Sequence, residues 1–116
     1  LRKRNAITNI EVAALSQMET DMQAKVSSGK NPGAGSSLMK MMASSLGQQI
    51  ATLQMEAIAN YSIPHNNRLL LEGKETIGRQ QDQTATAGYL NARASSIFGG
   101  AREVQKNIIA KSVLGL

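Results

Sequence analysis

Apolar residues recur at every third or fourth position between residues 5 and 28, and no glycine or proline interrupts this stretch before Gly29. This spacing is the period of an amphipathic helix, which turns one apolar face toward a core. Gly29 favours the end of such a helix, and Pro32 prevents its resumption. The sequence therefore predicts a long first helix and a short connection after it. The predicted apolar face consists of Ile7, Ile10, Ala14, Leu15, Met18, Met22 and Val26.

A second helix is predicted over residues 37–60, because its apolar residues also follow steps of three and four. Two long helices joined by a short connection form an antiparallel hairpin. We expect the methionines of the segment MKMM, residues 39–42, to fill the core, and a Met-rich binding surface is the alternative. Gly47 is expected to allow the close approach of a neighbouring helix. The predicted apolar face is Met39, Met42, Leu46, Ile50, Leu53 and Ala57.

Two adjacent glycines, Gly99 and Gly100, separate a third predicted helix over residues 86–98 from a fourth over residues 101–113. Glycine adopts backbone angles that other residues resist, and the break leaves the first amides of the fourth helix without helical partners. An anion or a flat ligand could approach there, and an ordinary turn between helices is the alternative. The predicted apolar faces are Tyr89, Leu90, Ala94, Ile97 and Phe98 in the third helix, and Val104, Ile108, Ile109 and Leu114 in the fourth.

Residues 61–85 lack a clear period, so we expect a long loop with one helical turn near residues 69–71. Long loops in compact domains are often functional. The single histidine, His65, lies in this loop. We do not assign it as a catalytic base, because no Ser, Asp or Cys stands at an informative spacing from it.

The composition favours an all-α fold, an up-and-down bundle of about four helices. Hydrophobic residues make up 41% of the chain but aromatic residues only 3%, so the core must be built from Ala, Leu, Ile, Val and Met. A length of 116 residues suits one domain. With no cysteine, disulfides and cysteine-type zinc sites are excluded, and a single histidine cannot build a metal site alone, so no metal site is expected. No apolar run is long enough to span a membrane.

The formal net charge of +5 could indicate an anionic partner, but the charges are dispersed. The one basic run, Arg2 to Arg4, lies at a terminus, where a solvated end is the simpler interpretation. No aromatic residues alternate with it, as a binder of single-stranded nucleic acid would require. We therefore expect no nucleic-acid partner.

The segment ASSIFGGAREVQKNIIAKSVLGL, residues 94–116, resembles the end of acyl-CoA dehydrogenases, flavoproteins that oxidise acyl-CoA thioesters to 2-enoyl-CoA. In this family the last helix opens with a glycine-containing turn. It then reads Glu, an apolar residue, Gln and a basic residue, which here are Glu103, Val104, Gln105 and Lys106. The segments SSGKNPGAGSSLMKMMASSLGQQIATLQMEAI (27–58) and GYLNARASSIFGG (88–100) are also similar to this family, with Lys40 at a typical basic position.

The resemblance implies that residues 1–116 are a single C-terminal helical domain, a fragment that lacks the N-terminal helical domain and the middle β-domain of its parent. It implies FAD as cofactor, acyl-CoA as substrate, and electron-transfer flavoprotein as electron acceptor. It also implies a homo-oligomer or a heteromeric dehydrogenase partner. The lack of cysteine fits a reducing compartment, and we expect a cytoplasmic, bacterial protein.

The resemblance also assigns site residues, with two departures from the family pattern. Many members carry the catalytic glutamate where this chain has Gly99, so no catalytic residue is assigned. Gly100 is expected to face the acyl-CoA, and Ala101 and Glu103 to lie near the FAD. A Gln-x-x-Gly-Gly stretch that often touches the partner subunit's FAD is degenerate here. Its matching positions are Glu56, Ala59 and Asn60, and Glu56 and Asn60 are expected to contact cofactor.

Two functions follow for a chain without the usual base. The base could come from an upstream helix of a catalytic parent, whose isolated domain is then expected to be inactive. Alternatively, the chain belongs to a non-catalytic partner subunit of a heteromeric dehydrogenase. Acyl-chain length is not predicted in either case.

Overall fold

The computed structural model describes residues 1–63, 67–74, 78–79 and 82–116. These residues contain helices and no strand, which confirms the all-α prediction. The α-helices are α1 (Arg2–Ser27), α2 (Gly35–Ile58), α3 (Asn67–Leu71), α4 (Ala85–Ala92) and α5 (Arg102–Ile109). Short 3₁₀ helices follow α2 (Ala59–Ser62) and α4 (Arg93–Ser96), and a π-helical turn (Ala110–Leu114) extends α5.

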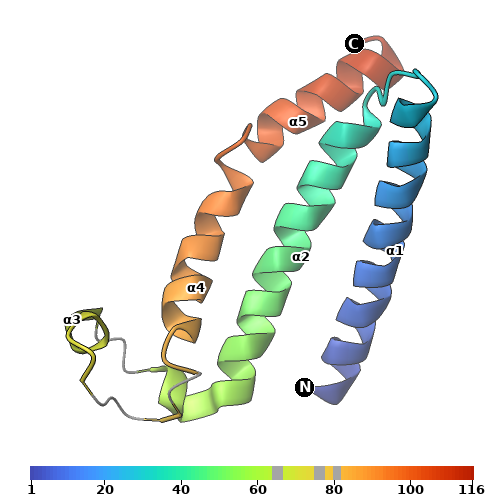
Figure 1. Cartoon of the computed structure of the whole chain (residues 1–116). Helices are drawn as coiled ribbons and strands as arrows, with labels where there is room; N and C mark the ends of the chain where they lie inside the picture. Colours follow the sequence, from blue (N-terminus) through green and yellow to red (C-terminus); the bar gives the residue numbers. More distant parts are fainter. Residues whose placement is uncertain (64–66, 75–77, 80–81) are drawn as a thin grey trace.

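Helix α2 is the middle member of a layer of helices. Helix α1 packs along one side of α2, and α4 and α5 pack along the other side (Figure 1). The chain runs up α1, down α2 and up again through α4 and α5, which confirms the up-and-down topology. The layer measures 54 × 27 × 25 Å, and α3 projects from one end of it.

The predicted breaks lie where glycines adopt positive φ. Helix α1 ends at Ser27, and Gly29 after it has φ 76°. Asn31 Oδ1 accepts a hydrogen bond from the Gly33 amide at 2.8 Å, which tightens the connection before α2. Gly115 ends the last helix with φ 69°, as its sequence position predicts. Gly29, Asn31 and Gly33 thus shape the connection that reverses the chain between α1 and α2.

The seam between α1 and α2 differs in part from the predicted apolar face. Thr8 is buried in it, and Glu11, Leu15, Met18 and Met22 are half-buried at alternating steps of three and four. Leu46, Ala51 and Leu53 of α2 are the buried apolar residues of the described chain. The prediction was wrong for Ile7, Ile10 and Val26, which are exposed because the seam uses the neighbouring stripe of α1.

Two expectations about α2 have different outcomes. The methionines at 39, 41 and 42 are all half-buried, in agreement with a core-filling role. Gly47 does not serve a close helix contact, because a Cβ placed there would meet nothing within 4 Å among the described residues. That prediction was wrong because Gly47 lies on the exposed side of α2.

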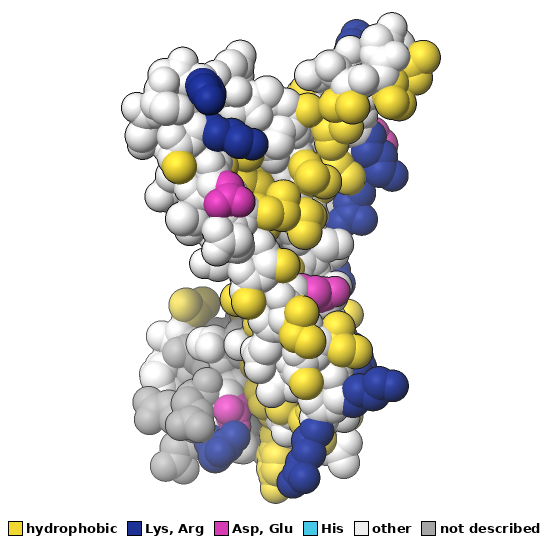
Figure 2. Space-filling model, turned by 90° about the vertical axis from the view of Figure 1, so that its right-hand side faces the viewer, with side chains coloured by type: hydrophobic (Ala, Val, Ile, Leu, Met, Phe, Trp, Pro, Cys, Tyr) yellow, Lys and Arg dark blue, Asp and Glu magenta, His cyan; other side chains and the backbone are white. Residues whose placement is uncertain are grey.

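Much apolar surface remains uncovered. The accessible surface is 8268 Å², whereas a compact monomer of 12.4 kDa is expected to expose about 6100 Å². The predicted buried side of the fourth helix is wrong for Val104, Ile108 and Leu114, which are exposed. No described residue covers them. Figure 2 shows hydrophobic side chains along a face of the molecule, with Lys and Arg near its edges.

Candidate functional site

The turn between α4 and α5 is built from backbone conformations that favour glycine. Gly99 has φ 65° and Gly100 has φ 96°, which confirms the prediction made from the adjacent glycines. A Cβ at Gly99 would meet nothing within 4 Å among the described residues, whereas one at Gly100 would clash with the side-chain amide of Gln105. The turn therefore exposes bare backbone at Gly99, and at Gly100 a side chain would be strained by the positive φ and would displace the Gln105 amide.

Helix α5 starts directly after this turn with unsatisfied amides. Ala101 is its N-cap residue, with φ −56° and ψ 151°, and no side chain of the described chain caps the helix start. The first amides of a helix lack carbonyl partners within it, so they point outward as donors. Glu103 lies in this first turn, where the helix dipole favours a carboxylate. The arrangement can receive a polar or anionic group.

Lys40 of α2 holds both sides of the glycine turn. Its Nζ donates to the carbonyl oxygen of Gly100 at 2.6 Å and to that of Ser95 at 3.2 Å. Both bonds are partly buried, and an ammonium donor makes them stronger than bonds between neutral groups. Lys40 thus ties the end of the 3₁₀ helix and the end of the turn to α2.

Gln48, two turns further along α2, binds the chain before the turn. Its Nε2 donates to the carbonyl oxygen of Ala92 at 3.1 Å, and the guanidinium of Arg93 donates back to the Gln48 carbonyl at 3.2 Å. Arg93 also lies over the ring of Tyr89, 4.5 Å from its centroid. On the other side of the turn, Arg102 Nη2 donates to Ser45 Oγ at 3.2 Å. Side chains of α2 therefore contact the chain before, within and after the turn.

A small cavity of about 250 Å³ opens beside the helix start. It is lined by Gln48, Ser96, Ile97, Arg102 and Glu103. Within the described part of the chain, the Nε of Arg102 is buried without a hydrogen-bond acceptor. Of the predicted site residues, Gly100, Ala101 and Glu103 share this region of turn, cavity and helix start.

Glu56 and Asn60 lie at the other end of α2. Glu56 is about 24 Å along the helix from Lys40, at 1.5 Å per residue. Its carboxylate forms an ion pair with the Arg4 guanidinium of α1. Asn60 lines a cavity of about 720 Å³ together with Tyr61, Arg79 and other residues. The structure therefore divides the predicted cofactor-binding residues into two separate groups.

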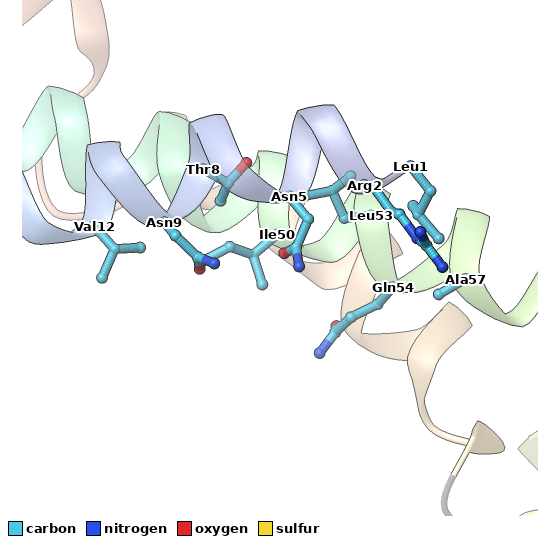
Figure 3. Close-up of a pocket in the computed structure, with 10 residues that line it drawn as sticks. All are labelled: Leu1, Arg2, Asn5, Thr8, Asn9, Val12, Ile50, Leu53, Gln54 and Ala57. Atoms are coloured by element: carbon cyan, nitrogen blue, oxygen red, sulfur yellow. The ribbon is translucent and has the colours of Figure 1, made fainter.

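A third hollow of about 440 Å³ lies between α1 and α2 (Figure 3). Apolar side chains and the amides of Asn5, Asn9 and Gln54 line most of it, and Arg2 is the one charged residue in its lining. This lining contains no carboxylate, histidine, lysine or cysteine side chain, so the Thr8 hydroxyl has no base among the lining residues to activate it. The hollow is therefore not a candidate active site.

Sequence reasoning missed the roles of Gln48 and Arg102, and it noted Lys40 without assigning it a contact. A signal was present, since Lys40, Ser44 and Gln48 follow a four-residue step and place polar groups on one face of the helix. The predicted loop residue His65 lies outside the described residues. Across the ranges that the structure describes, no group of acidic or histidine residues could hold a metal ion, and no helix could cross a membrane.

Comparison with known protein families gives a match over nearly the whole chain. The model of the family described as "Acyl-CoA dehydrogenase, C-terminal domain" matches residues 1–114. Searches of curated proteins and of solved structures found no match.

Proposed function

The chain belongs to the family of acyl-CoA dehydrogenase C-terminal domains, and we propose that residues 1–116 form this helical domain of an FAD-dependent acyl-CoA dehydrogenase. The parent enzyme oxidises acyl-CoA thioesters to 2-enoyl-CoA and passes electrons to an electron-transfer flavoprotein. The observation that carries the proposal is the turn at Gly99 and Gly100, because it places bare backbone directly before an uncapped helix start. We also propose a cytoplasmic, bacterial parent, and the cysteine-free sequence fits the reducing compartment that this requires.

The residues at the turn fit a flat, polar cofactor such as FAD. Open space around Gly99 permits close approach, and the amides after Ala101 supply unpaired donors. When bound, FAD would accept a hydride from the β-carbon of the thioester while a base removes the α-proton. In this assignment Gly100 faces the acyl-CoA, and Ala101 and Glu103 lie near the cofactor. The chain contributes binding and orientation at this site.

Glu56 and Asn60 are assigned to the cofactor of a neighbouring subunit. Their separation from the glycine turn, about 24 Å along α2 for Glu56 measured from Lys40, supports two distinct cofactor contacts on one chain. Such a division requires an oligomer, either of identical subunits or with a related dehydrogenase. The ion pair between Glu56 and Arg4 leaves Asn60 as the freer polar contact at this end.

The catalytic base is assigned to a part of the parent outside residues 1–116. Gly99 has no side chain. Glu103 lies in the first turn of α5, where its carboxylate interacts favourably with the helix dipole. The isolated domain is therefore expected to be inactive. The missing carboxylate at Gly99 also favours a second candidate function, that of a non-catalytic partner subunit in a heteromeric dehydrogenase.

The full-length protein provides the test. We expect the purified protein to show flavin absorption and to reduce an electron-acceptor dye when an acyl-CoA is added. Gly100→Ala should lower kcat/KM at least tenfold, because a Cβ is strained at φ 96° and also displaces the Gln105 side chain at the site. Gly73→Ala is the matched control, since Gly73 also has a positive φ (64°) but a Cβ there would meet nothing within 4 Å among the described residues.

The outcomes separate the two candidates. A protein that is colourless alone but gives an active flavoprotein with a co-expressed homologue supports the partner-subunit function. A protein that binds no flavin and turns over no acyl-CoA, alone or with a homologue, contradicts both.

A further inference from the structure

We infer that Lys40 is a positioning residue that sets the conformation of the glycine turn, and thereby the affinity of the proposed site for its cofactor. The inference rests on the proposed function for its link to FAD, but its structural part is independent. It starts from the two carbonyl oxygens that the Lys40 ammonium binds, those of Ser95 and Gly100. These residues flank the break between α4 and α5.

The backbone between the two carbonyls has little intrinsic conformational preference. Gly99 and Gly100 have more accessible backbone conformations than any other residue type, so the sequence of the turn alone does not fix its shape. Within the described chain, Lys40 is the one side chain seen to donate to the Gly100 carbonyl. The lysine ammonium has several donors, so it can bind both carbonyls at once and connect the two ends of the turn.

The other α2 contacts act on different parts of the chain. Gln48 binds the carbonyls of Ala92 and Arg93, before the turn, and Ser45 receives the Arg102 guanidinium, after it. These contacts hold the two helices against α2 whether or not Lys40 is present. Lys40 therefore controls the turn locally, and its loss should leave the helix layer intact.

The consequence concerns the helix start that follows. The carbonyl of Gly100 belongs to the peptide unit whose amide is that of Ala101, so fixing this oxygen also fixes the plane of the next amide. The amides proposed to contact FAD follow directly after this peptide unit. A turn that samples several conformations presents its donors correctly only part of the time, and the apparent affinity falls by that fraction.

The experiment compares Lys40→Met, Lys40→Arg and Lys30→Met in the full-length protein. Methionine keeps most of the chain length but removes the donor, arginine restores a cation, and Lys30 is an exposed lysine in the connection before α2. Two quantities are measured: amide hydrogen exchange across all helices, and the FAD dissociation constant from flavin fluorescence. The KM for acyl-CoA and kcat per bound flavin are measured in parallel.

Lys40→Met is expected to speed exchange in peptides covering residues 95–104 and to leave α1 and α2 at wild-type protection. The FAD dissociation constant should rise roughly tenfold or more, the scale of a lost hydrogen bond to a charged donor. KM should rise more than kcat per bound flavin falls. Lys40→Arg should recover part of each change, and Lys30→Met should match the wild type.

Two results overturn the inference. Unchanged exchange at residues 95–104 in Lys40→Met would show that the ammonium does not order the turn. Faster exchange spread over α2, α4 and α5 together would show a general structural role. A wild-type protein without flavin would contradict the proposed function instead, and local loosening of the turn would still support the role of Lys40 there.

Discussion

At the scale of single residues, backbone angles show where the sequence and the fold disagree. Ala59 follows α2 with φ 54° and ψ −129°, the one described residue other than glycine with positive φ. A Cβ in this region is strained by about 1–3 kcal/mol. By the resemblance described above, Ala59 matches the first glycine of the Gln-x-x-Gly-Gly stretch, and we attribute the strain to this departure.

Ala59→Gly is therefore expected to stabilise the fold by about 1 kcal/mol, because glycine adopts this conformation without strain. The matched control is Ala57→Gly, two residues earlier inside α2, which should destabilise by about 0.5–1 kcal/mol. Urea unfolding followed by circular dichroism measures both. Equal destabilisation by the two variants would contradict the assigned strain at Ala59.

At the scale of elements, the seam between α1 and α2 contains a polar mismatch. Glu11 occupies one of its half-buried positions, and no described residue donates to its buried Oε2. Glu11→Met should stabilise the hairpin by about 1 kcal/mol, because it removes an unsatisfied polar atom from the seam. The control Glu19→Met lies on the exposed side of α1 and should change the urea midpoint little.

Helix α3 carries a pH-dependent contact at its end. Hydrogen bonds from Lys74 first and Arg68 second hold the pKa of Glu72 below its usual value. The contact therefore stabilises α3 above the ordinary pKa of glutamate, and this contribution is lost as the pH falls through the lowered pKa. The effect is local because the group is exposed.

Carbon NMR of the Glu72 carboxyl should report this lowered pKa. Lys74→Met is expected to raise the pKa more than Arg68→Met does, since the lysine contributes the larger part. A titration that both variants leave unchanged would show that the two cations do not hold the carboxylate in solution.

At the scale of the whole molecule, the layer is too open for a self-sufficient domain. Its radius of gyration is 18.1 Å, against about 13.4 Å for a compact chain of this length. Large side chains such as Ile10, Val104 and Ile108 lie on outer surfaces. In the proposed parent, other domains and a second subunit would cover these faces.

The isolated domain is consequently expected to self-associate, because large exposed apolar patches drive contact between copies. Light scattering after size exclusion should give a mass above the 12.4 kDa monomer that grows with concentration. The double variant Val104→Ser with Ile108→Ser should shift the distribution toward monomer. A strictly monomeric wild type at all concentrations would argue against uncovered interfaces on α5.

The helices were predictable from the sequence, because Gly29, Pro32 and the Gly99–Gly100 pair interrupt clear helical periods. The positive φ of both glycines in the turn was also predictable. The buried faces were predicted less well: a period shows that a face is apolar, but no residue of the described part of the chain covers Ile10 or Val104. The contacts of Lys40 were not predictable, since they join residues 55 and 60 positions apart.

Helix α2 is the common neighbour of α1, α4 and α5. The surface of α2 therefore forms two interfaces, one on each side, whereas α1 forms one. In a saturation-mutagenesis library, tolerance to substitution should therefore differ between the helices. Leu46, Ala51 and Leu53 should accept few other residues, whereas positions in α1 should accept many more. The central helix is where the chain has the least freedom to evolve.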